Sequence, residues 1–114
     1  MLRFPGFRMK ALTLSYDDGV RADYKLMEIL NRYGIKCTFN LNSGWFAENE
    51  GEFRLTANEA KKIYSGSGHE IAVHGENHIS LSEVSEEIAV RDILKDRENL
   101  ESVVNATCGQ VFVL

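Results

Sequence analysis

The sequence is poor in proline, cysteine and positive charge, and each scarcity excludes a class of protein. It has 114 residues with one proline, two cysteines, and 13 Lys and Arg against 17 Asp and Glu, which gives a formal net charge of −4. No cluster of basic residues stands out, so nucleic acid is not an expected partner. No apolar run approaches the length of a membrane span. Cys37 and Cys108 are far apart, which favours reduced, packed thiols over a disulfide framework.

The N-terminal residues lack the pattern of a secretory signal. Arg3, Arg8 and Lys10 interrupt the segment that would have to form its apolar core. We therefore expect a cytoplasmic protein with no membrane association. With 44% hydrophobic and 26% charged residues, the composition is typical of a globular chain. Its length predicts a single domain over residues 1–114, with room for one modest core.

Hydrophobic patterns and capping signals predict four strands that alternate with three helices. Strands are expected over residues 9–16, 35–41, 69–73 and 110–114, and helices over residues 20–33, 56–64 and 86–105. Gly34 is expected to end the first helix, a Thr-x-x-Glu capping box to open the second, and Ser85 to cap the third. The order βαβαβαβ predicts an α/β fold with parallel strands and right-handed crossovers.

The third helix is predicted to bury one apolar stripe. Residues spaced by three and four along it define the expected inward face: Val90, Ile93, Leu94, Arg97, Leu100 and Val104. The aliphatic stem of the arginine would cover apolar surface while its charged end stays in water.

Chemistry-bearing residues follow two of the predicted strands. Asp17 and Asp18, with Gly19 after them, end the first strand, whereas His74 and His78 follow the third. Ligands gather at the carboxyl edge of parallel sheets, so these side chains are expected to meet there. One carboxylate and two imidazoles form a common ligand set for zinc or a similar divalent cation, and the second carboxylate is left over as a base.

Each motif also has a plainer interpretation when it is taken alone. Asp-Asp-Gly is a common turn sequence, and His-x-x-x-His also occurs as a helical surface pair. Their joint occurrence after successive strands favours the metal site. His69 lies at the start of the third predicted strand, away from its carboxyl end, and is expected to be structural. Trp45 and Phe46 fit either a sugar subsite or, preferably, core packing or a loop anchor.

The same motifs resemble those of a known family. Residues 13–19, Thr-Leu-Ser-Tyr-Asp-Asp-Gly, resemble the first motif of the polysaccharide deacetylases, also called carbohydrate esterase family 4 or the NodB homology domain. Residues 68–74, running into Asn77 and His78, resemble the second motif. The resemblance implies a distorted (β/α) barrel and metal-dependent removal of N- or O-acetyl groups from a carbohydrate. It implies Asp17 as the general base, and Asp18, His74 and His78 as ligands of a divalent cation, with zinc favoured.

Several positions depart from that pattern. Gly75 stands where the family usually has serine or threonine, and Tyr16 replaces the commoner phenylalanine. Residues 111–114 lack the third motif, and the later general-acid histidine has no counterpart. We therefore expect parallel βαβ units that form part of the barrel, with a homodimer covering the exposed edges. The alternatives are a non-catalytic metal- or glycan-binding module, an amidohydrolase acting on a non-sugar C–N bond, and a plain α/β domain without metal.

Overall fold

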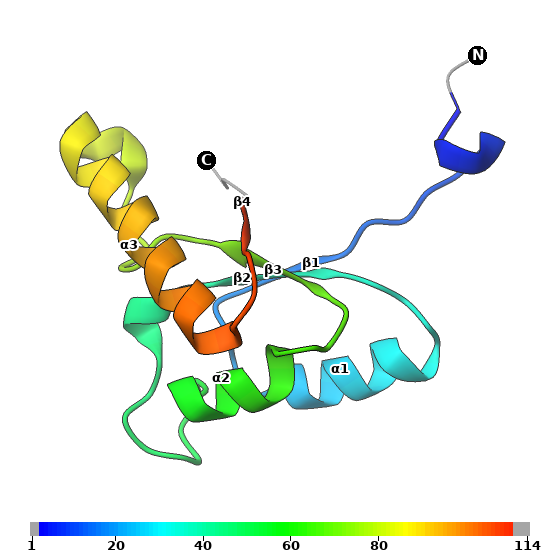
Figure 1. Ribbon diagram of the computed structural model, residues 1–114, viewed down its shortest axis with the longest axis horizontal. Coiled ribbons are helices and arrows are strands. Elements are labelled where there is room, and N and C mark those ends of the chain that lie inside the picture. Colours follow the sequence, from blue (N-terminus) through cyan, green and yellow to red (C-terminus); the bar gives the residue numbers. More distant parts are fainter. Residues whose placement is uncertain (1–2, 111–114) are drawn as a thin grey trace.

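A computed structural model describes residues 3–110 and shows one parallel sheet with helices packed against it (Figure 1). Strands β1 (Ser15–Asp17), β2 (Thr38–Leu41), β3 (Glu70–Val73) and β4 (Gly109–Gln110) lie side by side in that order. All three neighbouring pairs are parallel. The connections contain helices α1 (Asp23–Arg32), α2 (Ala57–Tyr64) and α3 (Glu86–Val104). The predicted α/β fold with parallel βαβ units is therefore confirmed.

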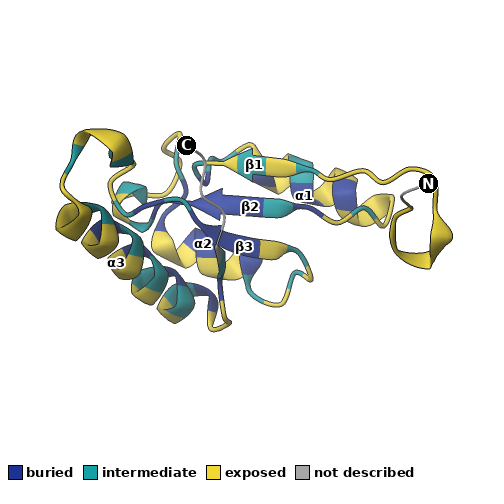
Figure 2. Ribbon diagram, turned by 90° about the horizontal axis from the view of Figure 1, so that it is seen from above, coloured by how far each residue is buried: buried dark blue, intermediate teal, exposed yellow. Residues whose placement is uncertain are grey.

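The first strand is shorter than the sequence predicts. Strand β2 pairs with β1 only from Ser15, opposite Thr38, to Asp17, opposite Asn40, so residues 9–14 have no partner strand. That segment runs away from the sheet toward the N-terminus, and most of its side chains are exposed (Figures 1 and 2). Residues 111–114, which were expected to form most of the last strand, lie outside the described residues.

The capping signals fix the ends of the helices as predicted. Gly34, at φ +63°, ends α1 in a motif in which Ile35 N–H donates to the Leu30 carbonyl at 2.9 Å. The Thr56 hydroxyl and the Glu59 side chain form a reciprocal capping box at the start of α2. Ser85 accepts from the Ile88 N–H and opens α3. These short-range interactions place the helix ends from local sequence alone.

The core lies around β2, which has a strand on each side (Figure 2). Phe39 and Leu41 are fully buried there, and Tyr64 of α2 and Leu100 of α3 pack into the same cluster. Helices α1 and α2 lie on one side of the sheet, and α3 contacts α2 and β3 (Figure 1). The candidate site lies at the carboxyl ends of the strands.

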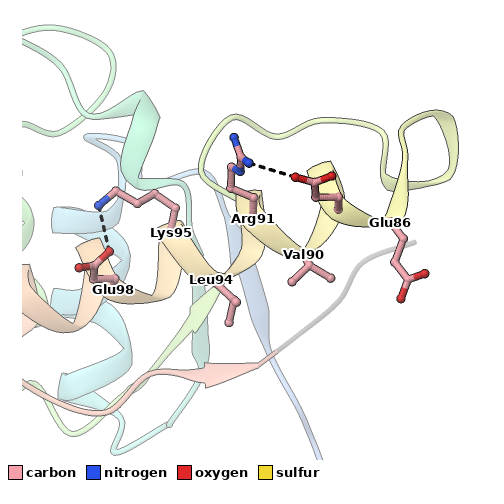
Figure 3. A pocket seen from close by; sticks show the side chains of 7 residues that line it. Glu86, Val90, Arg91, Leu94, Lys95 and Glu98 are labelled. Carbon is pink, nitrogen blue, oxygen red and sulfur yellow. Dashed lines mark hydrogen bonds and ion pairs between the residues drawn. The ribbon is translucent and has the colours of Figure 1, made fainter.

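The predicted inward stripe of α3 is wrong at Val90 and Leu94, whereas Ile93, Leu100 and Val104 contact the core. Val90 and Leu94 are about half exposed and line a shallow hollow of about 700 Å³ along α3. Their side chains point away from the Arg91–Glu87 and Lys95–Glu98 ion pairs of the same helix (Figure 3). The buried positions of this helix are Asp92, Asp96, Leu100 and Val104. In the N-terminal half Ile93 packs against the apolar core, and the buried residue Asp92 faces a polar turn.

The two thiols are buried and free, as expected. Burial raises the pKa of Cys37 and of Cys108 to about 11, so both stay protonated at neutral pH. Within residues 3–110, no helix is both long and apolar enough to cross a membrane.

Candidate metal centre

Three of the predicted site residues converge at the carboxyl edge of the sheet. Asp18 directly follows β1, His74 directly follows β3, and His78 lies in the turn after it. One ligand atom from each of the three lies within 4.8 Å of the others. Asp18 Oδ1 is 3.8 Å from His74 Nε2 and 3.9 Å from His78 Nε2. The parallel topology thus joins residues that are 56 positions apart in the sequence (His74 against Asp18).

The Asp18 carboxylate has an oxygen without a hydrogen-bond donor among residues 3–110, and this oxygen could bind a cation. Asp18 Oδ1 is buried and, among the described residues, has no hydrogen-bond partner. An orphaned buried acceptor costs about 1–3 kcal/mol, and more when it is charged. Donors of tetrahedral zinc at about 2.0–2.1 Å lie about 3.4 Å from one another. The two separations between Asp18 and the histidines are a few tenths of an ångström wider, and all three ligand atoms lie within 4.8 Å of one another. These three residues therefore fit a divalent cation.

The backbone reverses sharply at two of the three ligands. Asp18 has φ +78° and His78 has φ +52°, both in the left-handed region that non-glycine residues avoid, and Gly19 follows at φ +66°. The reversal after β1 is thus shared by Asp18 and Gly19. The Asn40 carbonyl, which accepts from Asp18 N–H at 2.9 Å, and the Arg54 guanidinium, which donates to the Asp18 carbonyl at 2.8 Å, hold this turn.

Asp17 lies beside the ligands and is partly open to solvent. Its Oδ2 is 3.9 Å from His74 Nε2, and its side chain is 47% exposed. Its Oδ1 accepts a hydrogen bond from Asn40 Nδ2 at 2.7 Å, because the two residues face each other across β1 and β2. Asn40 is fully buried and also donates to the Ser15 hydroxyl. One carboxylate oxygen is thus fixed, and the other faces the metal site.

An arginine and a tryptophan support His78. The indole of Trp45 stacks on the His78 imidazole, with ring centroids 4.9 Å apart and planes 20° apart. The Arg54 guanidinium lies 4.0 Å from the centroid of the Trp45 ring, and its Nη2 is 3.7 Å from Asp18 Oδ2. Trp45 therefore serves as an anchor beside a ligand. Arg54 follows no strand and no motif, so nothing in the sequence marked it.

The turn that carries both histidines is held by buried polar side chains. Asp96 accepts the N–H groups of His74 and Gly75 with Oδ2, at 3.1 and 3.0 Å. Asn42 donates to the carbonyls of the same two residues, at 3.0 and 2.7 Å. Burial raises the pKa of Asp96 above its ordinary value, and the N–H donors oppose that rise. The acids of α3 were missed because the helical pattern was interpreted from its apolar residues alone.

His69 lies apart from the site and is structural, as expected. Its Nδ1 accepts from the Cys37 N–H at 3.3 Å, which leaves Nε2 as the donor to Asn31 Oδ1 at 3.0 Å. Burial lowers the pKa of this imidazole, which favours the neutral form. Both ring nitrogens are therefore engaged by protein groups in one tautomer.

Comparison with known proteins identifies the family of this chain. The polysaccharide deacetylase family matches residues 6–113, nearly the whole chain. The chain belongs to the polysaccharide deacetylase family. The comparison with curated proteins gave no match.

Solved structures of polysaccharide deacetylases have the same fold. Streptococcus pyogenes deacetylase PplD, in complex with acetate, is 24% identical with a TM-score of 0.74 over 88% of this chain and 44% of its own. The Bc1960 peptidoglycan N-acetylglucosamine deacetylase is 28% identical with a TM-score of 0.65 over 83% of this chain and 42% of its own. A Clostridium thermocellum family 4 acetyl xylan esterase with a cobalt ion is 20% identical with a TM-score of 0.67 over 86% and 46%. The chain thus spans less than half the length of these proteins.

The glycine that departs from the deacetylase motif has a structural reason. Gly75 has φ +90°, and a Cβ at this position would lie 2.6 Å from Asp92 Oδ2. That buried oxygen has no hydrogen-bond partner among the described residues. The carboxylate of Asp92 therefore occupies the space that a serine or threonine side chain would need.

Proposed function

We propose that this chain forms the metal-binding part of a deacetylase that hydrolyses N- or O-linked acetyl groups on a carbohydrate. Asp18, His74 and His78 would hold a divalent cation, and Asp17 would act as the general base. The observation that carries the proposal is the convergence of those three ligand atoms within 4.8 Å around the orphaned Asp18 Oδ1. Membership of the polysaccharide deacetylase family supports the reaction class.

The donor set favours zinc over magnesium or calcium. Two imidazoles and one carboxylate suit zinc, cobalt and similar ions, whereas magnesium and calcium prefer all-oxygen sites. Three protein ligands are typical of catalytic zinc sites, which keep one position for water or substrate. A bound cation would polarise the acyl carbonyl and lower the pKa of water.

Asp17 is suited to accept the proton. Asn40 Nδ2 fixes Oδ1 at 2.7 Å, so Oδ2 is the oxygen that remains free on the side of His74. The exposed carboxylate can reach a water molecule at the site, and its fixed orientation avoids a reorganisation cost during proton transfer. The family suggests acetylated carbohydrate as the substrate, and the 28% identical neighbour deacetylates N-acetylglucosamine of peptidoglycan.

Calorimetric titration with zinc and with cobalt tests the metal site. The wild-type chain should bind one ion, and His78→Ala should lose that binding. His69→Gln is a matched control, because it removes the remaining histidine of the three in the sequence while leaving the ligands intact. It should bind metal like the wild type. A folded wild-type chain that binds neither ion would refute the proposal.

Release of acetate from acetylated chito-oligosaccharides and from acetylated xylan tests the reaction, with a non-sugar amide as the third substrate. Turnover of either glycan that Asp17→Asn abolishes, without loss of metal binding, is the expected result. Metal binding without turnover of any substrate would favour the non-catalytic module. Turnover of the amide alone would favour an amidohydrolase.

A further inference from the structure

Two buried carboxylates on α3 lie behind the candidate metal centre, one helical turn apart. Asp92 and Asp96 are 5% and 0% exposed. Burying a carboxylate is costly unless hydrogen bonds compensate it, so their place on the inward face calls for a function. Neither forms an ion pair among the described residues, and their partners are N–H groups of the site loops.

Asp96 joins the two loops that flank the site. Its Oδ1 accepts the Ser43 N–H at 2.7 Å, and its Oδ2 accepts the N–H groups of His74 and Gly75. Ser43 begins the short turn Ser43–Trp45, which carries the indole that stacks on His78. One carboxylate therefore contacts the backbone of the first histidine ligand and the backbone of the segment that supports the second.

Asp92 holds the middle of the same turn. Its Oδ1 accepts both the backbone N–H of Asn77, at 3.1 Å, and Asn77 Nδ2, at 2.9 Å. Asn77 directly precedes His78, whose left-handed backbone needs support from its surroundings. The Asp92 carbonyl also accepts the Glu76 N–H at 3.3 Å. Residues 74–77 thus direct all four of their backbone N–H groups to α3.

We propose that Asp92 and Asp96 are positioning residues that preorganise His74 and His78 and thereby set the affinity of the site for its divalent cation. This inference rests on the proposed metal site. The turn has no helix or strand of its own, and the two carboxylates accept the N–H groups of Gly75 and Asn77 and share the His74 N–H with the Leu41 carbonyl. Outer partners of metal ligands typically change affinity by about 10- to 100-fold, and we expect losses in that range.

The decisive comparison is between two substitutions at Asp92. Asp92→Asn keeps an oxygen for both Asn77 donors and should bind zinc within about threefold of the wild type. Asp92→Ala removes that oxygen, leaves the Asn77 N–H without its acceptor, and should weaken zinc binding by about tenfold or more. In Asp96→Asn one oxygen remains for the N–H donors of Ser43 and of the histidine turn, so we expect a similar or larger loss of zinc affinity.

Zinc affinity is measured by competition with a chromophoric chelator, and stability by thermal unfolding of each metal-free variant. The cobalt absorption spectrum adds a readout of ligand geometry. Glu59→Ala is the control: it removes another buried helix carboxylate, which caps α2 and contacts Arg21, away from the histidine turn. It should lower the unfolding temperature without changing zinc affinity or the cobalt spectrum.

The possible results separate this inference from the metal site itself. If the wild type binds zinc and Asp92→Ala and Asp96→Asn bind it equally tightly, the carboxylates only stabilise the fold and the inference is wrong. If Glu59→Ala weakens zinc binding as much as they do, the effect is general destabilisation and the inference is again wrong. If the folded wild type binds no zinc, the metal site fails and the inference fails with it. Should Asp96→Asn not fold, the Asp92 pair decides.

Discussion

Replacing Asp18 with asparagine should stabilise the metal-free protein while it abolishes metal binding. Among the described residues, Asp18 Oδ1 is buried and has no hydrogen-bond partner, and it lies 3.8 and 3.9 Å from two imidazole nitrogens. A neutral imidazole presents a lone pair, to which an asparagine Nδ2 can donate but a carboxylate cannot. Asparagine also tolerates the left-handed backbone at this position as well as aspartate does.

The magnitude follows from three contributions. Relief of an orphaned buried acceptor contributes about 1–3 kcal/mol in favour of Asp18→Asn. Loss of the partly exposed contact between Asp18 and Arg54 costs about 0–1 kcal/mol, since the 3.7 Å pair is open to solvent. The backbone term is close to zero. The net gain is about 1 kcal/mol, which corresponds to a rise of roughly 4 °C in the unfolding temperature of a domain of this size.

Thermal unfolding with chelator and with zinc measures both effects. In wild type, zinc at about 100 times its dissociation constant should add about 2.7 kcal/mol of stability. The Asp18→Asn variant should unfold at a higher temperature than wild type in chelator and show no comparable shift with zinc. A variant that is less stable than wild type in chelator would refute the reasoning about the orphaned oxygen. An equal zinc shift in both proteins would refute the role of Asp18 as a ligand.

Three further predictions concern other parts of the chain. The hydrogen bond from the Thr56 N–H and the contact with Arg21 lower the pKa of the Glu59 carboxyl, so its stabilising effect is present above the ordinary pKa and is lost as the pH falls through the lowered value. Urea unfolding should show wild type more stable than Glu59→Gln at pH 7, with the difference vanishing in acid. Gly75→Ala should lower the free energy of unfolding by about 1–3 kcal/mol and weaken zinc binding. The φ of +90° strains any residue other than glycine, and the added Cβ would lie 2.6 Å from a carboxylate oxygen. Denaturant unfolding measures the first effect and chelator competition the second. Leu94→Ala should change the free energy of unfolding by less than about 0.5 kcal/mol, whereas Leu100→Ala should cost about 2–5 kcal/mol, because the first side chain is exposed and the second is fully buried.

The convergence of Asp18, His74 and His78 could be predicted from sequence because it depends mainly on the topology of the sheet. Parallel strands bring their carboxyl ends to one edge, so polar residues that follow β1 and β3 must lie near each other. Asp18 and His74 each follow a strand directly, and His78 is tied to His74 by a short turn. The capping roles of Thr56 and Ser85 could be predicted as well, because each interacts with a residue three positions away in the sequence.

The supporting residues could not be predicted in the same way. Arg54 and Trp45 contact the site through side chains whose direction depends on loop conformation, and no periodic pattern governs a loop. The buried face of α3 could not be predicted fully, because apolar periodicity assumes that a helix packs against apolar surface. Asp92 and Asp96 of this helix face the histidine turn, which presents backbone N–H groups. The two aspartates are therefore buried there, and Leu94 is exposed.

These features together link the metal to the stability of the domain. The left-handed backbone at Asp18 and at His78 and the orphaned oxygen at Asp18 each cost free energy, and all three lie within one ligand set. A cation would satisfy the orphaned oxygen and would stabilise only the conformation in which both strained residues are in place. The carboxylates of α3 reduce the same cost in the metal-free state, because they accept hydrogen bonds from the backbone N–H groups of the turn. We therefore expect two kinds of substitution to have different effects. Removing the ligand carboxylate should raise metal-free stability while it abolishes metal binding, whereas removing a supporting carboxylate should lower both metal affinity and metal-free stability.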